Sequence, residues 1–179
     1  MHLSAAYADG FGLSFEMFPP KTPAGDEALR NELRRLAEYD PAFISCTYGA
    51  GGSTRDRTLS WCRELVEDFG QAVTAHFTCV GSAAGDLSEW LSAAGEIGVS
   101  NIMALRGDAP DDGSWSPAPN GLRFANELVA FLRENFPQFG IGVAGYPEKH
   151  PECVDTATDL ANLKRKVDAG ADAIFTQLF

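Results

Sequence analysis

The 179-residue sequence predicts an α/β protein built around a parallel β-sheet, and two patterns support this class. First, short apolar runs bounded by Gly, Pro or polar residues alternate with amphipathic stretches, at about one pair per 30 residues. Second, the short runs are apolar at nearly every position, as in strands that are buried on both faces of a parallel sheet.

The elements follow from these patterns in chain order. The predicted strands are Leu13–Phe18, Ala42–Thr47, Val73–Cys79, Asn101–Leu105, Gly140–Ala144 and Asp172–Phe179. The predicted helices are Asp26–Tyr39, Thr54–Phe69, Leu87–Ile97, Leu122–Phe136 and Thr156–Ala169. In the second helix Leu59, Cys62 and Leu65 recur at helical spacing and mark a core-facing stripe. Gly170 is placed to adopt the left-handed conformation that closes a helix before a strand.

Two architectures accommodate this alternation, a closed eight-stranded barrel and an open doubly wound sheet. No G-x-G-x-x-G follows the first strand, which disfavours the dinucleotide-binding form of the open sheet. Polar residues instead gather after the carboxyl ends of the strands, where β/α-barrels place their active sites. We therefore predict a TIM (β/α)8 barrel that forms a single domain over residues 1–179.

The predicted barrel is shorter than a complete one, which has eight strands in about 250 residues. Six strands and five helices are predicted here. An open six-stranded remnant leaves two sheet edges unpaired and apolar faces uncovered. We therefore expect a truncated barrel that does not catalyse its reaction alone.

Composition excludes several classes of protein. The formal net charge is -11, from 14 Lys and Arg against 25 Asp and Glu, which argues against a nucleic-acid or anionic-membrane partner. No apolar run approaches the roughly 20 residues of a membrane span, and no signal peptide is evident. The four cysteines form no C-x-x-C pair and are expected to be reduced thiols of a cytoplasmic protein. The three histidines show no metal-binding spacing.

Glu16 is the first candidate for chemistry. It lies between Phe15 and Met17-Phe18 and precedes Pro19-Pro20. Apolar neighbours would desolvate the carboxyl, raise its pKa and keep it protonated near neutrality, which suits a general acid. The alternative is a carboxylate at the barrel rim that is hydrogen-bonded to backbone.

Further polar residues follow later strands. Arg106-Gly107-Asp108 ends the fourth strand and precedes a long loop rich in Pro and Asp, and loops of this length are more often functional than accidental. Tyr146 and His150 follow the fifth strand, where two prolines restrict the backbone, and His76 lies in the third strand. The cation run Lys164-Arg165-Lys166 suggests either a phosphate contact or a solvated helical face.

Taken together, these segments resemble one family, the bacterial single-domain form of methylenetetrahydrofolate reductase. The matching motifs run in the family's order across almost the whole chain. They are F-E-M-F-P-P at 15–20, T-Y-G-A at 47–50, R-D-R-T at 55–58, H-F-T-C at 76–79, A-L-R-G-D at 104–108, Y-P-E at 146–148 with H-P at 150–151, N-L-K-R-K-V-D-A-G-A at 162–171 and T-Q at 176–177.

The resemblance implies non-covalent FAD, NADH or NADPH as co-substrate, and reduction of 5,10-methylenetetrahydrofolate to 5-methyltetrahydrofolate for methionine synthesis. It implies a cytoplasmic homo-oligomer. By position, Glu16 and Asp108 resemble the catalytic residues, and both contact the folate together with Gln177. The residues matching positions that hold FAD are Thr47, Tyr48, Ala50, His76, Arg106, Gly107, Asp108, Phe124, Ala125, Tyr146, His150, Asp159, Asn162, Arg165 and Lys166.

Two alternative functions stay open at this point. One is a non-catalytic barrel fragment of such an enzyme that binds FAD or folate. The other is a barrel lyase that works through a Schiff-base lysine, which requires a lysine on an inner strand. Every lysine lies outside the predicted strands, so the lyase is disfavoured.

Overall fold

The computed structural model describes residues 1–8, 10–48, 55–108 and 118–179, which form one parallel sheet with its helices. The strands are β1 Ser14–Met17, β2 Phe43–Cys46, β3 Val73–Thr78, β4 Asn101–Leu105, β5 Gly140–Gly145 and β6 Ala173–Thr176. The helices are α1 Leu3–Ala6, α2 Pro23–Ala37, α3 Arg55–Glu67, α4 Ala84–Ile97, α5 Ala125–Asn135 and α6 Thr156–Asp168.

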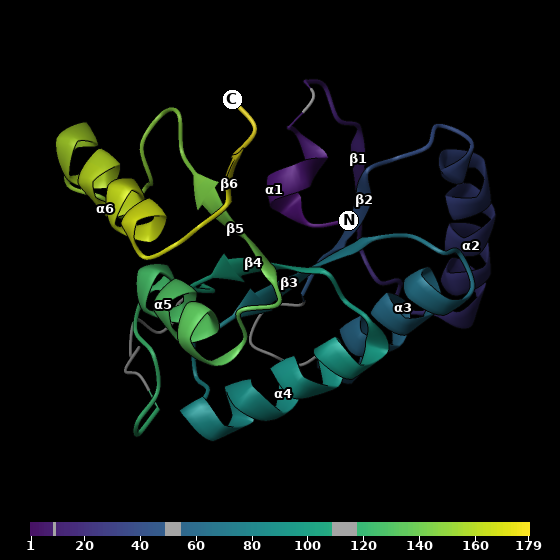
Figure 1. The fold of residues 1–179 in the computed structure, drawn as a ribbon, viewed down its shortest axis with the longest axis horizontal. Helices are drawn as coiled ribbons and strands as arrows, with labels where there is room; N and C mark the ends of the chain where they lie inside the picture. The colour runs from purple at the N-terminus through teal and green to yellow at the C-terminus, as the bar shows by residue number, and fades with distance from the viewer. Residues whose placement is uncertain (9, 49–54, 109–117) are drawn as a thin grey trace.

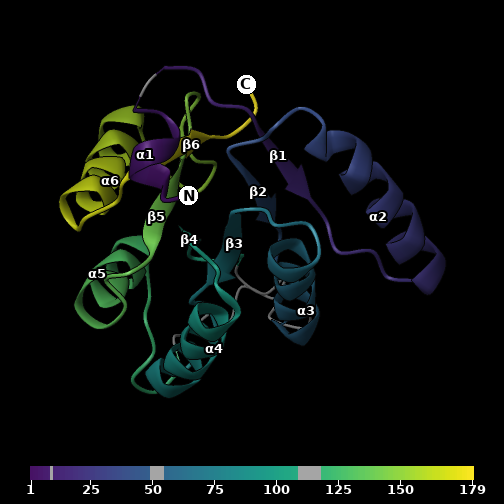
Figure 2. The same ribbon diagram turned by 45° about the vertical axis from the view of Figure 1, so that its right-hand side comes forward.

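The strands follow one another in chain order across the sheet, and every neighbouring pair is parallel. The sheet is curled. Helices α2 to α6 form an arc along its outer face, whereas α1 lies inside the curve near β5 (Figures 1 and 2). The predicted α/β fold, a truncated β/α-barrel, is thereby confirmed. In the described part of the chain, β1 and β6 are the two edges of the sheet.

The outer core lies between the sheet and the arc of helices. Alternation along β3 directs Phe77 outward, where its ring stacks on Trp90 of α4 with centroids 4.5 Å apart. Cys62 and Leu65 of α3 are fully buried in the same core, which confirms the predicted stripe. Burial of this apolar layer is the dominant favourable contribution to folding.

The inner face is closed at its amino-terminal end by α1 and by aromatic rings. Leu3 of α1 is buried, and its backbone N–H donates to Asn101 Oδ1 at 2.8 Å. The Asn101 side-chain nitrogen donates in turn to the carbonyl of Met1 at 3.0 Å. Phe43 of β2 meets Phe175 of β6 edge to face at 6.0 Å, a contact across the interior that requires a curled sheet.

Local sequence signals set most helix ends. Thr22 and Asp155 cap α2 and α6 by accepting backbone N–H groups, and Pro23 occupies the first turn of α2. Gly170 follows α6 with φ of +117°, so the predicted left-handed turn is confirmed. The four-residue helix α1 was not predicted, because it is too short to show an apolar period.

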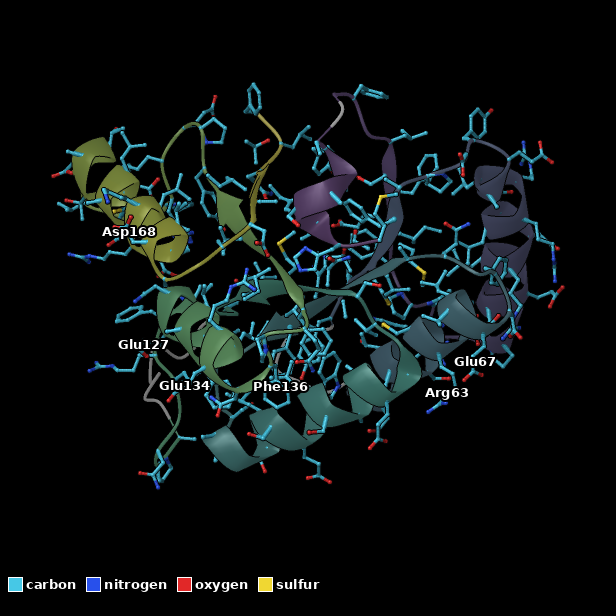
Figure 3. All side chains as sticks on the ribbon, in the orientation of Figure 1. Arg63, Glu67, Glu127, Glu134, Phe136 and Asp168 are labelled. Atoms are coloured by element: carbon cyan, nitrogen blue, oxygen red, sulfur yellow. The ribbon has the colours of Figure 1, made fainter. Side chains whose placement is uncertain are left out.

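The outward helix faces carry charged side chains. Arg63 and Glu67 lie one turn apart on α3 and form an exposed ion pair of 3.0 Å, while Glu134 and Asp168 mark the surfaces of α5 and α6 (Figure 3). Of the helices described, none is long and apolar enough to cross a bilayer. The four cysteines are free thiols, as predicted.

Replacing Asn101 with Ala is expected to lower the free energy of unfolding by about 1–3 kcal/mol. The change leaves the buried N–H of Leu3 without its acceptor, and an unsatisfied buried donor is costly. Urea denaturation monitored by circular dichroism measures the change. Asn135→Ala, at the exposed end of α5, is the matched control and should stay within about 0.5 kcal/mol of wild type. Equal effects of the two changes would contradict the stabilising role of the buried hydrogen bond between Leu3 and Asn101.

Candidate active site

The carboxyl ends of all six strands lie along one edge of the sheet, because the strands are parallel. Glu16 and His76 lie in β1 and β3, close to this edge. Arg106-Gly107-Asp108 follows β4, and Tyr146 follows β5. The edge therefore collects the predicted site residues from distant parts of the chain, as in β/α-barrel enzymes.

Glu16 and His76 meet across the intervening strand β2. Glu16 Oε2 lies 3.2 Å from His76 Nε2, and the side chains are 48% and 14% exposed. The residue beside Glu16 in β2 is Ser45, whose small side chain leaves this path open. The distance is within hydrogen-bonding range, but Nε2 is shielded from solvent and lacks a well-aligned acceptor among the described residues. The contact therefore lacks the alignment of a fully formed hydrogen bond, and it is an ion pair only when His76 is protonated.

The expectation of a raised pKa for Glu16 is wrong, because the apolar neighbours lie elsewhere. Met17 is buried in the outer core, and Phe15 packs edge to face on Tyr39. The pKa of Glu16 is lowered, mainly by its interaction with His76, which outweighs partial burial. This contact stabilises the fold above the pKa of an unperturbed glutamate and is lost as the pH falls through the lowered pKa.

Arg106 pairs with Glu152 of the loop before α6. Two guanidinium nitrogens donate to the two carboxylate oxygens at 2.6 and 2.8 Å. This pair raises the pKa of Arg106 and lowers that of Glu152. Asp108 is exposed at the same strand end, and its charge also acts on Arg106. Glu152 was not among the predicted site residues, although it is the next residue after the H-P motif at 150–151.

Tyr146 and His150 form a second cluster. Their rings meet edge to face at 4.6 Å, and His150 Nδ1 accepts the backbone N–H of Glu152 at 3.1 Å. The pKa of Tyr146 is raised, first by burial and then by the charge of Asp108. Asp159 of α6 acts on the same phenol. These residues therefore surround one region between β4, β5 and α6.

The cations of α6 face in different directions. Lys166 turns toward the sheet, where its ammonium donates to the carbonyl of Ala144, and burial lowers its pKa. Arg165 is exposed and donates to Asn162 Oδ1 at 2.9 Å. The run is therefore more than a solvated face, because one of its cations is partly buried.

Other predicted residues lie apart from these clusters. The ring of Tyr48 packs on Phe77 and Trp90 at the outer face. Gln177 is exposed after β6, and in the described chain no hydrogen bond or ion pair joins it to Glu16 or Asp108. Phe124 and Ala125 begin α5. Ala50 lies outside the described residues.

Two residues of the R-D-R-T motif hold the strand ends in place, a role that the sequence did not indicate. Arg57 donates to the carbonyl of Pro20 and to the Asp26 carboxylate, both at 2.5 Å. Thr58 is buried and donates to the carbonyl of Thr47 at 3.2 Å. These hydrogen bonds attach the segments after β1 and β2 to α3. The sequence alone does not reveal them, because the partners of Arg57 and Thr58 lie in other segments of the chain.

A shallow, mainly apolar pocket of about 160 Å³ lies between α6 and β6, next to Tyr146. Leu160, Leu163 and Ile174 line it, with Asp159 at its margin. Within the described ranges, no group of three or more His, Cys, Asp or Glu side chains is arranged to hold a metal ion.

Comparison with known proteins identifies the family. The family model described as methylenetetrahydrofolate reductase matches residues 2–179. The chain belongs to the methylenetetrahydrofolate reductase family. It is 41% identical over 167 residues to 5,10-methylenetetrahydrofolate reductase of Escherichia coli (strain K12), covering 93% of this chain and 54% of that protein. It is 40% identical over 177 residues to methylenetetrahydrofolate reductase (NADH) 1 of Arabidopsis thaliana, covering 93% of this chain and 30% of that protein.

The chain spans about half the length of the bacterial relatives it matches. Solved structures support the fold alone. A putative lyase/mutase from Burkholderia cenocepacia J2315 superposes with a TM-score of 0.63 at 21% identity, over 93% of this chain and 60% of that one. Deoxyribose phosphate aldolase from Aeropyrum pernix gives 0.59 at 15% identity, over 92% of this chain and 62% of that one.

Cys79 is expected to resist alkylation in the folded protein. Burial raises the pKa of its thiol to about 11, and only the thiolate is an effective nucleophile. Iodoacetamide at about pH 8 should therefore label the partly exposed Cys153 and leave Cys79 unmodified until the protein unfolds. Peptide mass spectrometry measures both sites. Labelling of Cys79 in the folded state at the rate of Cys153 would contradict the burial.

Proposed function

We propose that the full-length protein reduces 5,10-methylenetetrahydrofolate to 5-methyltetrahydrofolate in the cytoplasm, with FAD as cofactor and NADH or NADPH as hydride source. The proposal rests mainly on the position of Glu16, which lies next to His76 at the carboxyl ends of the strands in a chain of this family. Opening the five-membered ring of the folate requires a proton at a ring nitrogen, and a carboxyl group can supply it. The free thiols agree with a reducing compartment.

The edge has the groups that an anionic dinucleotide needs. Arg165 and Lys166 on α6 would hold phosphates, and Arg106 supplies a third cation once its pairing with Glu152 is exchanged for a ligand. Gly107 has φ of +92°, and a Cβ there would collide with the side chain of Val80, so this position at the edge requires glycine. Bound FAD would supply the chemistry of hydride transfer between the nicotinamide and the folate.

The chain's own residues divide the remaining work. Glu16 would donate the proton that opens the folate ring. Asp108 would contact the folate and place a negative charge beside the cofactor. Gln177, a donor and acceptor after β6, would bind the pterin ring.

The decisive experiment combines flavin binding with turnover. Full-length protein should gain flavin absorbance with FAD, bleach with NADH or NADPH, and regain its colour when methylenetetrahydrofolate is added. Failure to bind FAD would refute the proposal. Binding without folate turnover would leave the alternative, a non-catalytic flavin- or folate-binding protein.

Glu16→Gln should slow folate reduction by at least about 100-fold, because an amide cannot supply the proton. FAD binding and flavin reduction by the nicotinamide cofactor should stay near wild type, since neither step needs this proton. Stopped-flow absorbance separates the two half-reactions. Glu96→Gln, on the exposed face of α4, is the matched control and should leave both unchanged. Loss of FAD from Glu16→Gln would support the structural alternative.

Asp108→Asn should raise the midpoint potential of bound flavin by about 30 mV, or roughly 1.4 kcal/mol for a two-electron couple. Removing a negative charge favours the more negative, reduced state, which then becomes a weaker hydride donor. Dye-equilibrated spectroelectrochemistry measures the potential. Asp68→Asn, near the end of α3, removes the same charge far from the edge. An unchanged potential with unchanged folate kinetics would exclude Asp108 from the site.

A further inference from the structure

The contact between Glu16 and His76 raises a difficulty for the proposed function. A general acid must carry a proton when its substrate arrives. His76 lowers the pKa of Glu16, so the carboxyl is ionised near neutrality. A proton source for Glu16 is therefore required.

The geometry limits where this proton can come from. His76 Nε2 is shielded from solvent, whereas the Glu16 side chain is about half exposed. A proton on Nε2 can therefore leave toward Glu16 Oε2, 3.2 Å away, and from there toward a bound molecule. A small rotation of the imidazole would align the N–H with the carboxylate.

The surroundings isolate the pair from other charges. Ser45 lies beside Glu16 in β2, and Met103 lies opposite His76 in β4, and neither is ionisable. Neither Arg106 nor Asp108, at the end of β4, contributes to the pKa shift of Glu16. Of the described residues, His76 alone exerts a charge effect on Glu16.

We propose that Glu16 and His76 share one proton and act as a single proton-storing unit, with Glu16 as its outlet toward the substrate nitrogen. Before binding, the proton resides on Nε2 and Glu16 is a carboxylate. A bound ligand that covers the carboxylate excludes water, which makes the separated charges costly and favours the neutral pair. His76 is then a positioning residue that acts through Glu16, and this role rests on the proposed function.

The proton balance closes over one cycle. The Nε2–H bond breaks and an O–H bond forms on Oε2, which leaves a neutral imidazole and a carboxylic acid. The acid then protonates the folate nitrogen as the ring C–N bond breaks, and the bond electrons stay on that nitrogen. After the product leaves, water supplies a proton through the exposed carboxyl, which refills the store. At higher pH the unit formed by Glu16 and His76 holds its shared proton less often, so folate reduction slows.

Nuclear magnetic resonance tests the coupling without turnover. Glutamate carboxyl carbons are titrated in full-length wild type, His76→Gln and Ser45→Val. The pKa of Glu16 should rise toward its ordinary value in His76→Gln. It should rise in Ser45→Val as well, because the bulkier residue blocks the path while both titrating groups remain. His2→Gln, far from the edge, is the matched control. A Glu16 pKa that stays low in both variants would overturn the inference.

Single-turnover reduction of methylenetetrahydrofolate by pre-reduced protein tests the role. His76→Gln, measured on protein saturated with FAD, should be slower by at least about tenfold and lose the pH dependence. Added imidazole should restore rate to His76→Ala, a rescue that a purely structural histidine would not show. If wild type reduces folate but the titration shows no effect of His76 on the pKa of Glu16, this inference is overturned and the proposed function is not. If the titration shows that His76 lowers the pKa of Glu16 but wild type reduces no folate, both the proposed role of the shared proton and the proposed function are overturned.

Discussion

Parallel pairing of the six strands is the constraint on which the rest of this molecule depends. A parallel neighbour can be reached only by a long crossover, so each of β1 to β5 is followed by a helix that returns along the outer face. The same pairing brings every strand end to one edge. Residues separated by more than a hundred positions in sequence therefore reach one region. The pairing of the strands brings them together, and the local sequence around each residue does not.

Sequence patterns predicted the strands of the sheet more accurately than the segments that cover its inner face. β4 was predicted at its observed bounds, and β3 and β5 within one residue, because buried strands are apolar at every position. β6 was predicted to continue to Phe179 but ends at Thr176, where pairing with β5 stops. Helix α1 carries too little sequence to reveal itself and depends on Asn101, a contact almost a hundred residues away.

The candidate site was predicted as a set of residues but not as a set of contacts. Motifs selected Glu16 and His76 separately, and their approach across β2 depends on sheet curvature, which no local pattern encodes. The sign of the Glu16 pKa shift was wrong for the same reason, since its sequence neighbours point to the opposite face. Glu152, Arg57 and Thr58 act through partners distant in sequence.

The closed amino-terminal end of the inner face also bears on how this chain can diverge. An added Cβ at Gly140 would lie 2.2 Å from the Asn101 amide oxygen, and one at Gly142 would lie 2.7 Å from the ring of Phe175. Neither position tolerates a substitution unless its partner changes at the same time. Evolutionary drift at this end must therefore proceed through paired replacements, whereas the exposed helix faces can accept changes one at a time.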